Sequence, residues 1–146
     1  MAKRPPHRDS LVGRSALVAM ALAVSACTAP APKSVKPLAS LSGTVTYQEP
    51  ITLSPDAMLT VELADVSRQD THAKVLAEQI ISNPGQPPIP FKLSYDPDAI
   101  VPNHSYAVQA RIEWEGRLVF INDTRHCVLT RGCPTSVNVV VVPARR

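Results

Sequence analysis

The chain has 146 residues, of which 45% are hydrophobic and 18% charged, and it contains 15 prolines. This length suits one folded domain, and the apolar content is too high for a wholly disordered chain. Residues 1–26 carry four basic side chains and one acidic one, whereas residues 27–146 carry eleven of each kind. The body of the chain is therefore neutral, which argues against a nucleic-acid partner.

The N-terminus has the three parts of a secretory signal. A basic segment is followed by the ten-residue apolar run 15–24 and then by the small residues Ser25 and Ala26. Ten helical residues rise about 15 Å, which is half of the hydrocarbon thickness of a bilayer, so this run is poorly suited to remain as a membrane span. We expect residues 1–26 to be a signal peptide.

Cys27 follows in the sequence Val24-Ser25-Ala26-Cys27, which resembles the lipobox of bacterial lipoproteins. In that motif the small residues admit a peptidase and the cysteine thiol accepts a diacylglycerol. The resemblance predicts acyl chains on Cys27 that anchor the mature protein in a membrane. Thr28 stands where an aspartate would indicate retention in the inner membrane, so we expect the periplasmic face of the outer membrane. An ordinary signal peptide followed by a chance cysteine is the alternative.

Residues 27–40 form a proline-rich linker after the lipidated cysteine. Prolines favour extended polyproline geometry, in which the thirteen residues after Cys27 would reach roughly 40 Å. We expect a tether that holds the folded domain away from the lipid surface and has no specific partner of its own.

Residues 41–146 alternate short apolar runs with turn residues, which is typical of an all-β domain. The segment 75–81 is ambiguous because its propensity also suits a helix, and its strand neighbours favour a strand. Seven strands of this spacing predict an antiparallel two-sheet β-sandwich rather than a barrel. The predicted strands are 42–47, 57–66, 75–81, 89–95, 106–114, 118–123 and 137–142.

Local signals add detail to this sandwich. Asp96-Pro97 predicts one short helical turn, with the aspartate as N-cap, and Glu115-Gly116 predicts a two-residue hairpin turn. Pro90 lacks the N–H that a central strand needs, so strand 89–95 should start at a sheet edge. Alternation places five of the six aromatic side chains, Trp114 among them, on inward rows, and leaves Tyr47 undecided.

Two cysteines, Cys127 and Cys133, remain after Cys27 is assigned to the lipid. An exported chain sits in an oxidising compartment, so we expect these two to form a disulfide. The alternative with a chemical function is a redox-active or metal-binding pair of these cysteines with His126. It lacks CxxC spacing and further ligands in the sequence, so we expect no metal.

The remaining polar residues give no catalytic pattern. Motifs for nucleotide binding, zinc hydrolysis and serine hydrolases are absent from the sequence. We therefore expect no enzyme, no cofactor and no small-molecule substrate, although a site assembled from distant residues stays an alternative. The candidates considered are His72, His104, His126, the carboxylate pairs Asp96/Asp98 and Glu113/Glu115, and the hydroxyls of Ser67 and Ser94.

Three groups of sequence blocks stand out in the domain: 59–68 with 76–79; 90–97, Ile100 and 104–112; and 116–124, 129–132 and Pro134. Together these blocks resemble the YbaY/YscW family of Gram-negative lipoproteins. The resemblance implies a β-sandwich on a lipid anchor. One branch, the YscW-type pilotins, binds secretin subunits and guides them to the outer membrane. The family offers no catalytic residues, and the Cys127/Cys133 pair is not part of its pattern.

These observations predict a non-enzymatic outer-membrane lipoprotein that presents a protein-binding domain to the periplasm. Its role would be that of a pilotin-like chaperone or of envelope maintenance. The partner would be an unidentified envelope protein, with a secretin-like protein as one candidate. Strand 89–95 and loop 96–105 are the expected exposed edge, and an edge that proline merely protects from aggregation is the alternative. The alternative function is a carbohydrate-binding module, which requires an exposed aromatic side chain.

Overall fold

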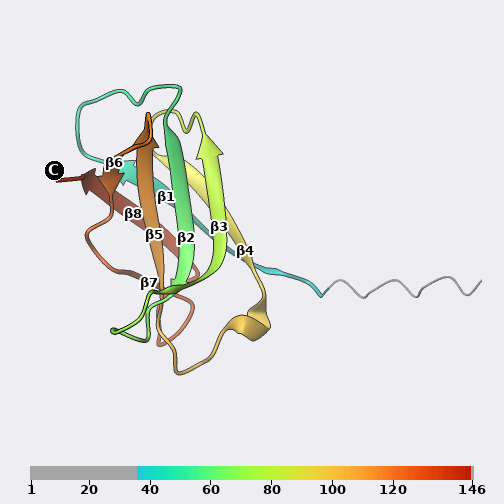
Figure 1. Ribbon diagram of the computed structural model, residues 1–146. Helices are drawn as coiled ribbons and strands as arrows, with labels where there is room; N and C mark the ends of the chain where they lie inside the picture. Colours follow the sequence, from blue (N-terminus) through green and yellow to red (C-terminus); the bar gives the residue numbers. More distant parts are fainter. Residues whose placement is uncertain (1–35, 146) are drawn as a thin grey trace, which may run out of the picture. The chain divides into compact units, whose positions relative to one another are not determined.

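The computed structural model describes residues 36–145. The expected signal peptide, the lipidation site Cys27 and most of the linker lie outside these residues. Within the described range, no helix has the length and apolar character required to cross a bilayer. The elements, in chain order, are β1 (Ala39–Tyr47), β2 (Met58–Asp65), β3 (Lys74–Ser82), β4 (Ile89–Tyr95), the 3₁₀ turn η1 (Pro97–Ala99), β5 (Tyr106–Trp114), β6 (Arg117–Ile121), β7 (His126–Val128) and β8 (Ser136–Pro143) (Figure 1).

The all-β prediction is confirmed, and all seven predicted strands are present with small shifts at their ends. The ambiguous segment 75–81 is strand β3. The additional strand, β7, has three residues and was not predicted, because so short a run shows no periodicity. Strand β1 begins at Ala39, inside the expected linker, because Ala39 and Ser40 pair with the end of β4.

The strands form one continuous sheet rather than the expected two separate sheets. Its order is β3-β2-β5-β6-β8-β1-β4, with β7 paired to β5. Only two residue pairs, Phe120 with Pro143 and Ile121 with Val142, join β6 to β8. The sheet curls until its end strands β3 and β4 lie against each other, so it is nearly closed (Figure 1). Alternation in a sequence reveals which face of a strand is buried, but not which strands pair across a short junction.

The pairing of β1 with β8 is parallel, whereas the other pairs are antiparallel. The expectation of a wholly antiparallel domain is therefore wrong at this position. The first and last strands of the domain lie side by side, from Ser42 opposite Ser136 to Tyr47 opposite Val141. A long separation along the chain makes this pairing invisible to local sequence patterns.

Alternating side chains fill the inside of the curled sheet. In β2, Leu59, Val61 and Leu63 are fully buried, as their alternation predicts. Tyr47 is also buried, at 7% exposure, and its ring stacks on Phe120 with the ring centroids 5.1 Å apart. The Tyr47 hydroxyl donates to the carbonyl of Ile51 at 3.1 Å and lies 2.9 Å from Gln86 Oε1, so its polar end is hydrogen bonded.

Trp114 does not belong to the core, although alternation placed it on an inward row. It is 44% exposed because β5 ends there, at the tip of the β5–β6 hairpin. The hairpin turn is the predicted one: Glu115 and Gly116 both have positive φ, 49° and 72°, as a type I′ turn requires. The inward row of β5 therefore ends at Ile112.

The other local predictions hold. Asp96 caps η1, because its Oδ1 accepts a hydrogen bond of 2.9 Å from the Asp98 N–H, and Pro97 is the first residue of the turn. Strand β4 lies at an end of the sheet, as Pro90 predicted. Lys36 forms ion pairs with Asp96 and Asp98, so the segment before β1 contacts η1.

Cys127 and Cys133 are joined by a disulfide in the structure, with their Cα atoms 5.7 Å apart. The bond closes the loop between β7 and β8. Leu129, Arg131 and Gly132 in this loop have positive φ. Positive φ values restrict the conformations that this turn can adopt, and the disulfide encloses the turn.

We expect the double substitution of Cys127 and Cys133 by serine to lower the free energy of unfolding by about 2 kcal/mol, because a short closed loop restricts the unfolded chain. Urea denaturation of the oxidised wild type and of the variant measures this difference. Wild-type protein treated with a reductant is the matched control. Equal midpoints in all three samples would contradict the expected contribution.

Candidate protein-binding surfaces

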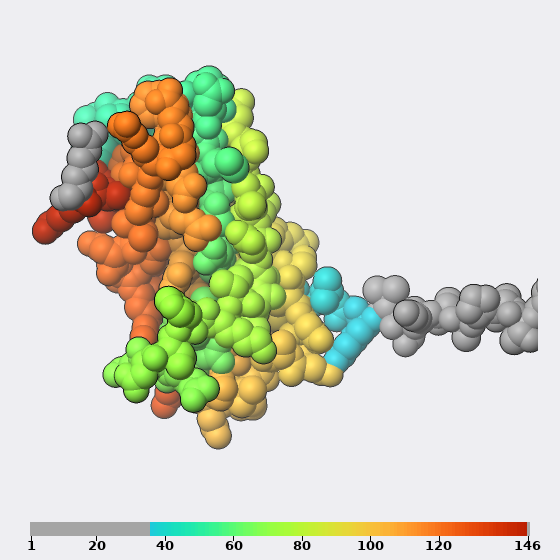
Figure 2. Space-filling view, in the orientation of Figure 1, coloured from blue at the N-terminus to red at the C-terminus, as the bar shows by residue number. Residues whose placement is uncertain are grey.

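Four large apolar side chains of β2, β3 and β6 are exposed on two adjacent rows of the outer sheet face, which Figure 2 shows from the front. They are between 39% and 57% exposed, although they belong to sheet strands with paired backbones. Clusters of this kind mark contact surfaces more often than isolated exposed residues do. Two rows of register partners cross the face, Ser82-Met58-Glu113-Leu118 and Ile80-Thr60-Arg111-Ile121. We call Met58, Ile80, Leu118 and Ile121 the apolar face.

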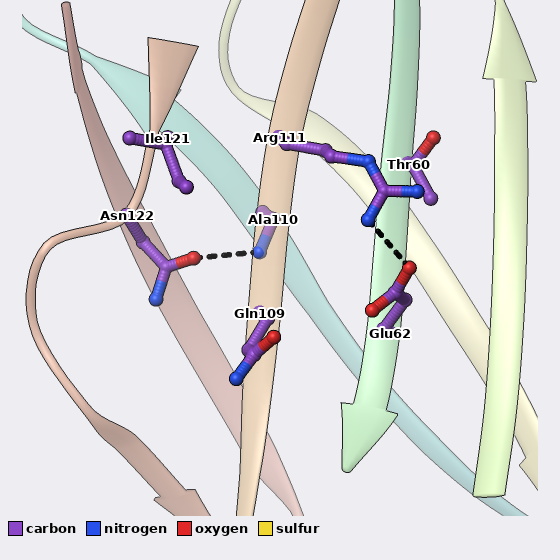
Figure 3. A pocket seen from close by; sticks show the side chains of 7 residues that line it. All are labelled: Thr60, Glu62, Gln109, Ala110, Arg111, Ile121 and Asn122. Atoms are coloured by element: carbon purple, nitrogen blue, oxygen red, sulfur yellow. Dashed lines mark hydrogen bonds and ion pairs between the residues drawn. The ribbon is translucent and has the colours of Figure 1, made fainter. Parts of the chain in front are cut away.

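An ion-pair cluster lies between these apolar side chains. Arg111 reaches from β5 to β2, where its Nη1 is 2.6 Å from Glu62 Oε1 (Figure 3). Its Nε is 3.3 Å from Oε1 of Glu113, on β5 itself. Thr60, which faces outward beside it, is buried. A pocket of about 190 Å³ adjoins the cluster, and Ile121 and Asn122 line it on the side away from Glu62 (Figure 3). The outer face thus combines an apolar surface with fixed charges.

The tip of the β5–β6 hairpin carries a second exposed apolar surface. Trp114 and Leu118 line a hollow there, together with Glu115, Arg117 and Ala144. An aromatic ring next to charged side chains in a hollow is the arrangement that sugar binding uses, and the carbohydrate alternative requires it. Tyr47 does not contribute to this hollow, because it is buried against Phe120.

The expected binding edge, β4, is an end strand but is not fully open. Lys92 donates its backbone N–H to Gln79 Oε1 of β3 at 2.8 Å, so a side chain bridges the two ends of the sheet. Pro90 has no N–H to offer. We call the line where β3 and β4 meet the seam. Sequence reasoning placed the edge correctly but could not find Gln79, whose role depends on a contact between strands that do not pair.

A polar cluster at the β2–β3 end of the domain brings together residues that seemed isolated in the sequence. His104 Nδ1 lies 2.6 Å from Asp65 Oδ2, and the Ser67 hydroxyl donates to Asp65 Oδ1 at 2.5 Å. The backbone N–H of Ser105 donates to the Ser67 oxygen at 2.8 Å. These bonds tie the loop after β2 to the loop before β5.

The same three residue types serve nucleophilic catalysis elsewhere, but their order here is different. A nucleophilic serine needs a hydrogen bond to a base that takes its proton. The Ser67 proton is instead directed at Asp65, which stands between the serine and His104. This arrangement fastens two loops and provides no activated hydroxyl. Asp65 was not singled out in the sequence, because its partner lies 39 residues away.

The pKa of Asp65 is lowered by this cluster. Partial burial acts to raise it, but the hydrogen bonds from Ser67 and the neighbouring His104 together outweigh burial and hold the pKa below its usual value of 3.8. A carboxyl with a lowered pKa in the folded state stabilises the fold above its unfolded pKa. This contribution is lost as the pH falls through the folded pKa.

We therefore expect Asp65→Asn to lower the free energy of unfolding by about 1 kcal/mol at pH 7. The gap between the two proteins should begin to narrow below about pH 4, where the carboxyl of the unfolded wild type becomes protonated, and it should close as the pH falls through the lowered pKa of the folded state. Urea denaturation at pH 7, 5 and 3 measures both effects. Asp123→Asn, an exposed carboxylate outside the cluster, is the control. A gap between Asp65→Asn and wild type that stays constant down to pH 3 would contradict the assignment.

The other candidate residues are not gathered into a site. His126 faces the inside opposite Val108, and its buried Nε2 has no hydrogen-bond partner among the described residues. His72 and Ser94 are exposed on a loop and on β4. Among residues 36–145, no group of three or more histidine, cysteine, aspartate or glutamate side chains is arranged to hold a metal ion. The candidate carboxylate pair Glu113/Glu115 is not free either, since Glu113 pairs with Arg111.

Comparison with known proteins gives a consistent result. The profile of the family described as "Type III secretion system lipoprotein chaperone (YscW)" matches residues 36–141. The uncharacterized lipoprotein YbaY of Escherichia coli strain K12 is 38% identical over 108 residues, which cover 73% of this chain and 56% of that protein. The chain thus spans about half of the length of this relative.

A solved structure has the same fold. It is an alternative pilotin from the type II secretion system of Vibrio cholerae, with a TM-score of 0.72 and 38% sequence identity. The match covers 75% of this chain and all of the pilotin chain. The profile, the relative and the solved structure each match about three quarters of this chain, and the chain belongs to the YscW family of lipoprotein chaperones.

Proposed function

We propose that this protein is a non-enzymatic lipoprotein, acylated on Cys27 and anchored at the periplasmic face of the outer membrane. Its domain binds another envelope protein as a pilotin-like chaperone. The observation that carries this proposal is the apolar face. Four exposed apolar side chains on one face of a sheet favour burial against a partner protein. The pilotin among its structural relatives supports a secretin-type protein as that partner.

Site-specific crosslinking tests the apolar face in intact cells. A photoreactive amino acid at Leu118 should crosslink to one envelope protein, which mass spectrometry identifies. The same label at Val101 is the matched control, since Val101 is 42% exposed and Leu118 43%, but Val101 lies in a loop. We expect Ile80→Asp to reduce the Leu118 crosslink on the order of tenfold, because burial of a charge at the contact is costly. Equal crosslinking at 118 and 101 would contradict the proposed surface.

The anchor has a separate test. Mass spectrometry of the mature protein should find a first residue, Cys27, that carries fatty acyl mass. Replacing Cys27 by serine should release the protein from the membrane fraction. A mature protein that begins elsewhere, or that lacks acyl mass, would reject the anchor while leaving the binding surface to its own test.

Carbohydrate binding is the second candidate, and the exposed Trp114 in its hollow favours it. The chain has one tryptophan, so its fluorescence reports on this hollow alone. Titration with soluble peptidoglycan fragments should shift the emission if the hollow binds sugars, and Trp114→Phe should remove the signal. Unchanged emission would reject this candidate.

A further inference from the structure

The two ends of the sheet meet at the seam without backbone pairing. Strands β3 and β4 lie against each other, and no ladder joins them among the described residues. The bridge that the structure shows is the hydrogen bond from the Lys92 N–H to Gln79 Oε1, 2.8 Å long. Gln79 shares the inward row of β3, opposite the fully buried Val61. Its amide therefore reaches the backbone of β4 from inside the seam.

The free edge of β4 offers few backbone hydrogen-bond donors to a further strand. Residues alternate in pointing their backbone groups toward β1 or away from it. Since the Lys92 N–H points to Gln79, the backbone nitrogens of Pro90 and Ser94 face the same side. Pro90 has no N–H, and the Lys92 donor is occupied by Gln79. Ser94 alone keeps a donor that a new strand could use without displacing anything.

The side chains around the seam define what could occupy it. Leu76, Ile81 and Tyr95 are partly buried apolar residues that pack on the core beside the seam. Lys92 is exposed on the outer side and forms no ion pair within residues 36–145. An extended segment with apolar side chains inward and an acidic side chain opposite Lys92 would fit both the apolar inner side and the charged outer side of the seam. Pairing with a second copy would bring two Lys92 charges together, which is unfavourable.

We propose that the seam is a strand-addition site for an extended, acidic protein segment, and that Gln79 keeps it closed until such a segment displaces the Gln79 amide. The segment would take over the Lys92 N–H with a backbone carbonyl. The apolar face has its backbone groups paired within the sheet, so the two surfaces bind by different means and are tested separately. This inference does not depend on a secretin as partner.

A designed peptide tests the seam with the mature lipoprotein in detergent. The probe is a short strand of alternating threonine and valine with a central glutamate. It is N-methylated on alternate residues, so that only one edge can form hydrogen bonds. We expect Gln79→Ala to bind it about fivefold more tightly than wild type, because no amide competes for Lys92. Glu78→Ala, the exposed neighbour on β3, is the matched control and should bind as wild type does.

Two changes at Lys92 complete the test. Lys92→Pro removes the backbone donor and should abolish binding, while Lys92→Glu should reverse the preference toward a peptide with a central lysine. Hydrogen exchange of the Lys92 amide, which should be faster in Gln79→Ala, checks the closure without any peptide. Equal affinity of wild type and Gln79→Ala, or no binding to either, would overturn the proposal. A lost crosslink at Leu118 would instead bear on the apolar face.

Discussion

Gly43→Ala should lower the free energy of unfolding by about 3 kcal/mol, which is at the upper end for a single added methyl group. A Cβ atom at this position would overlap the backbone carbonyl oxygen of Val137 and would lie 2.7 Å from the Phe91 ring. Neither neighbour has room to move. The carbonyl belongs to β8, which pairs with β1 at this residue, and Phe91 is buried on β4.

Urea denaturation of Gly43→Ala measures this cost, with Ser42→Ala as the control. Ser42 is the exposed neighbour on β1, and its loss should change stability by less than about 0.5 kcal/mol. If both variants unfold at the same urea concentration, the close approach of β1, β8 and Phe91 is not what the structure shows. In that case β1 would pair with different neighbours.

Phe120→Ala should cost about 3–5 kcal/mol, as expected for removal of a buried aromatic ring. Phe120 is 1% exposed and stacks on Tyr47, and it pairs with Pro143 at the junction between β6 and β8. Because this junction has only two residue pairs, we also expect faster hydrogen exchange at its backbone amides. The loosening of backbone hydrogen bonds should therefore extend beyond the side chains that line the new cavity.

Leu118→Ala is the matched control for Phe120→Ala. It removes a large side chain from the same strand, but one that is exposed on the apolar face. It should leave stability within about 0.5 kcal/mol of wild type. A similar loss in both variants would mean that Phe120 does not hold the junction.

The elements of this fold follow from local sequence, but their assembly does not. Alternation located Leu59, Val61 and Leu63 in the core, and Glu115 with Gly116 at a hairpin turn, because each signal lies within a few neighbouring residues. The continuous sheet, with β1 beside β8, depends on contacts across most of the domain. Trp114 was misplaced because alternation continues to the end of a strand, whereas the core ends earlier.

The candidate surfaces show the same division. Pro90 marked β4 as an edge, because a missing N–H has a local consequence. The apolar face could not be read in the same way, since Met58, Ile80 and Leu118 come from three separate strands that meet only through their register. Gln79 had no distinguishing neighbour in the sequence. Its significance arises where two unpaired strand ends approach each other.

The parallel pairing of β1 with β8 sets a condition on how the domain is made. A chain that emerges from its N-terminus presents β1 first, yet one neighbour of β1 arrives only with residues 136–141. Until then β1 has β4 alone, and the two halves of the sheet have no junction. Nonlocal closure of this kind is slow and leaves unfinished intermediates. A product that stops before residue 136 would therefore fail as a whole, instead of yielding a smaller working unit.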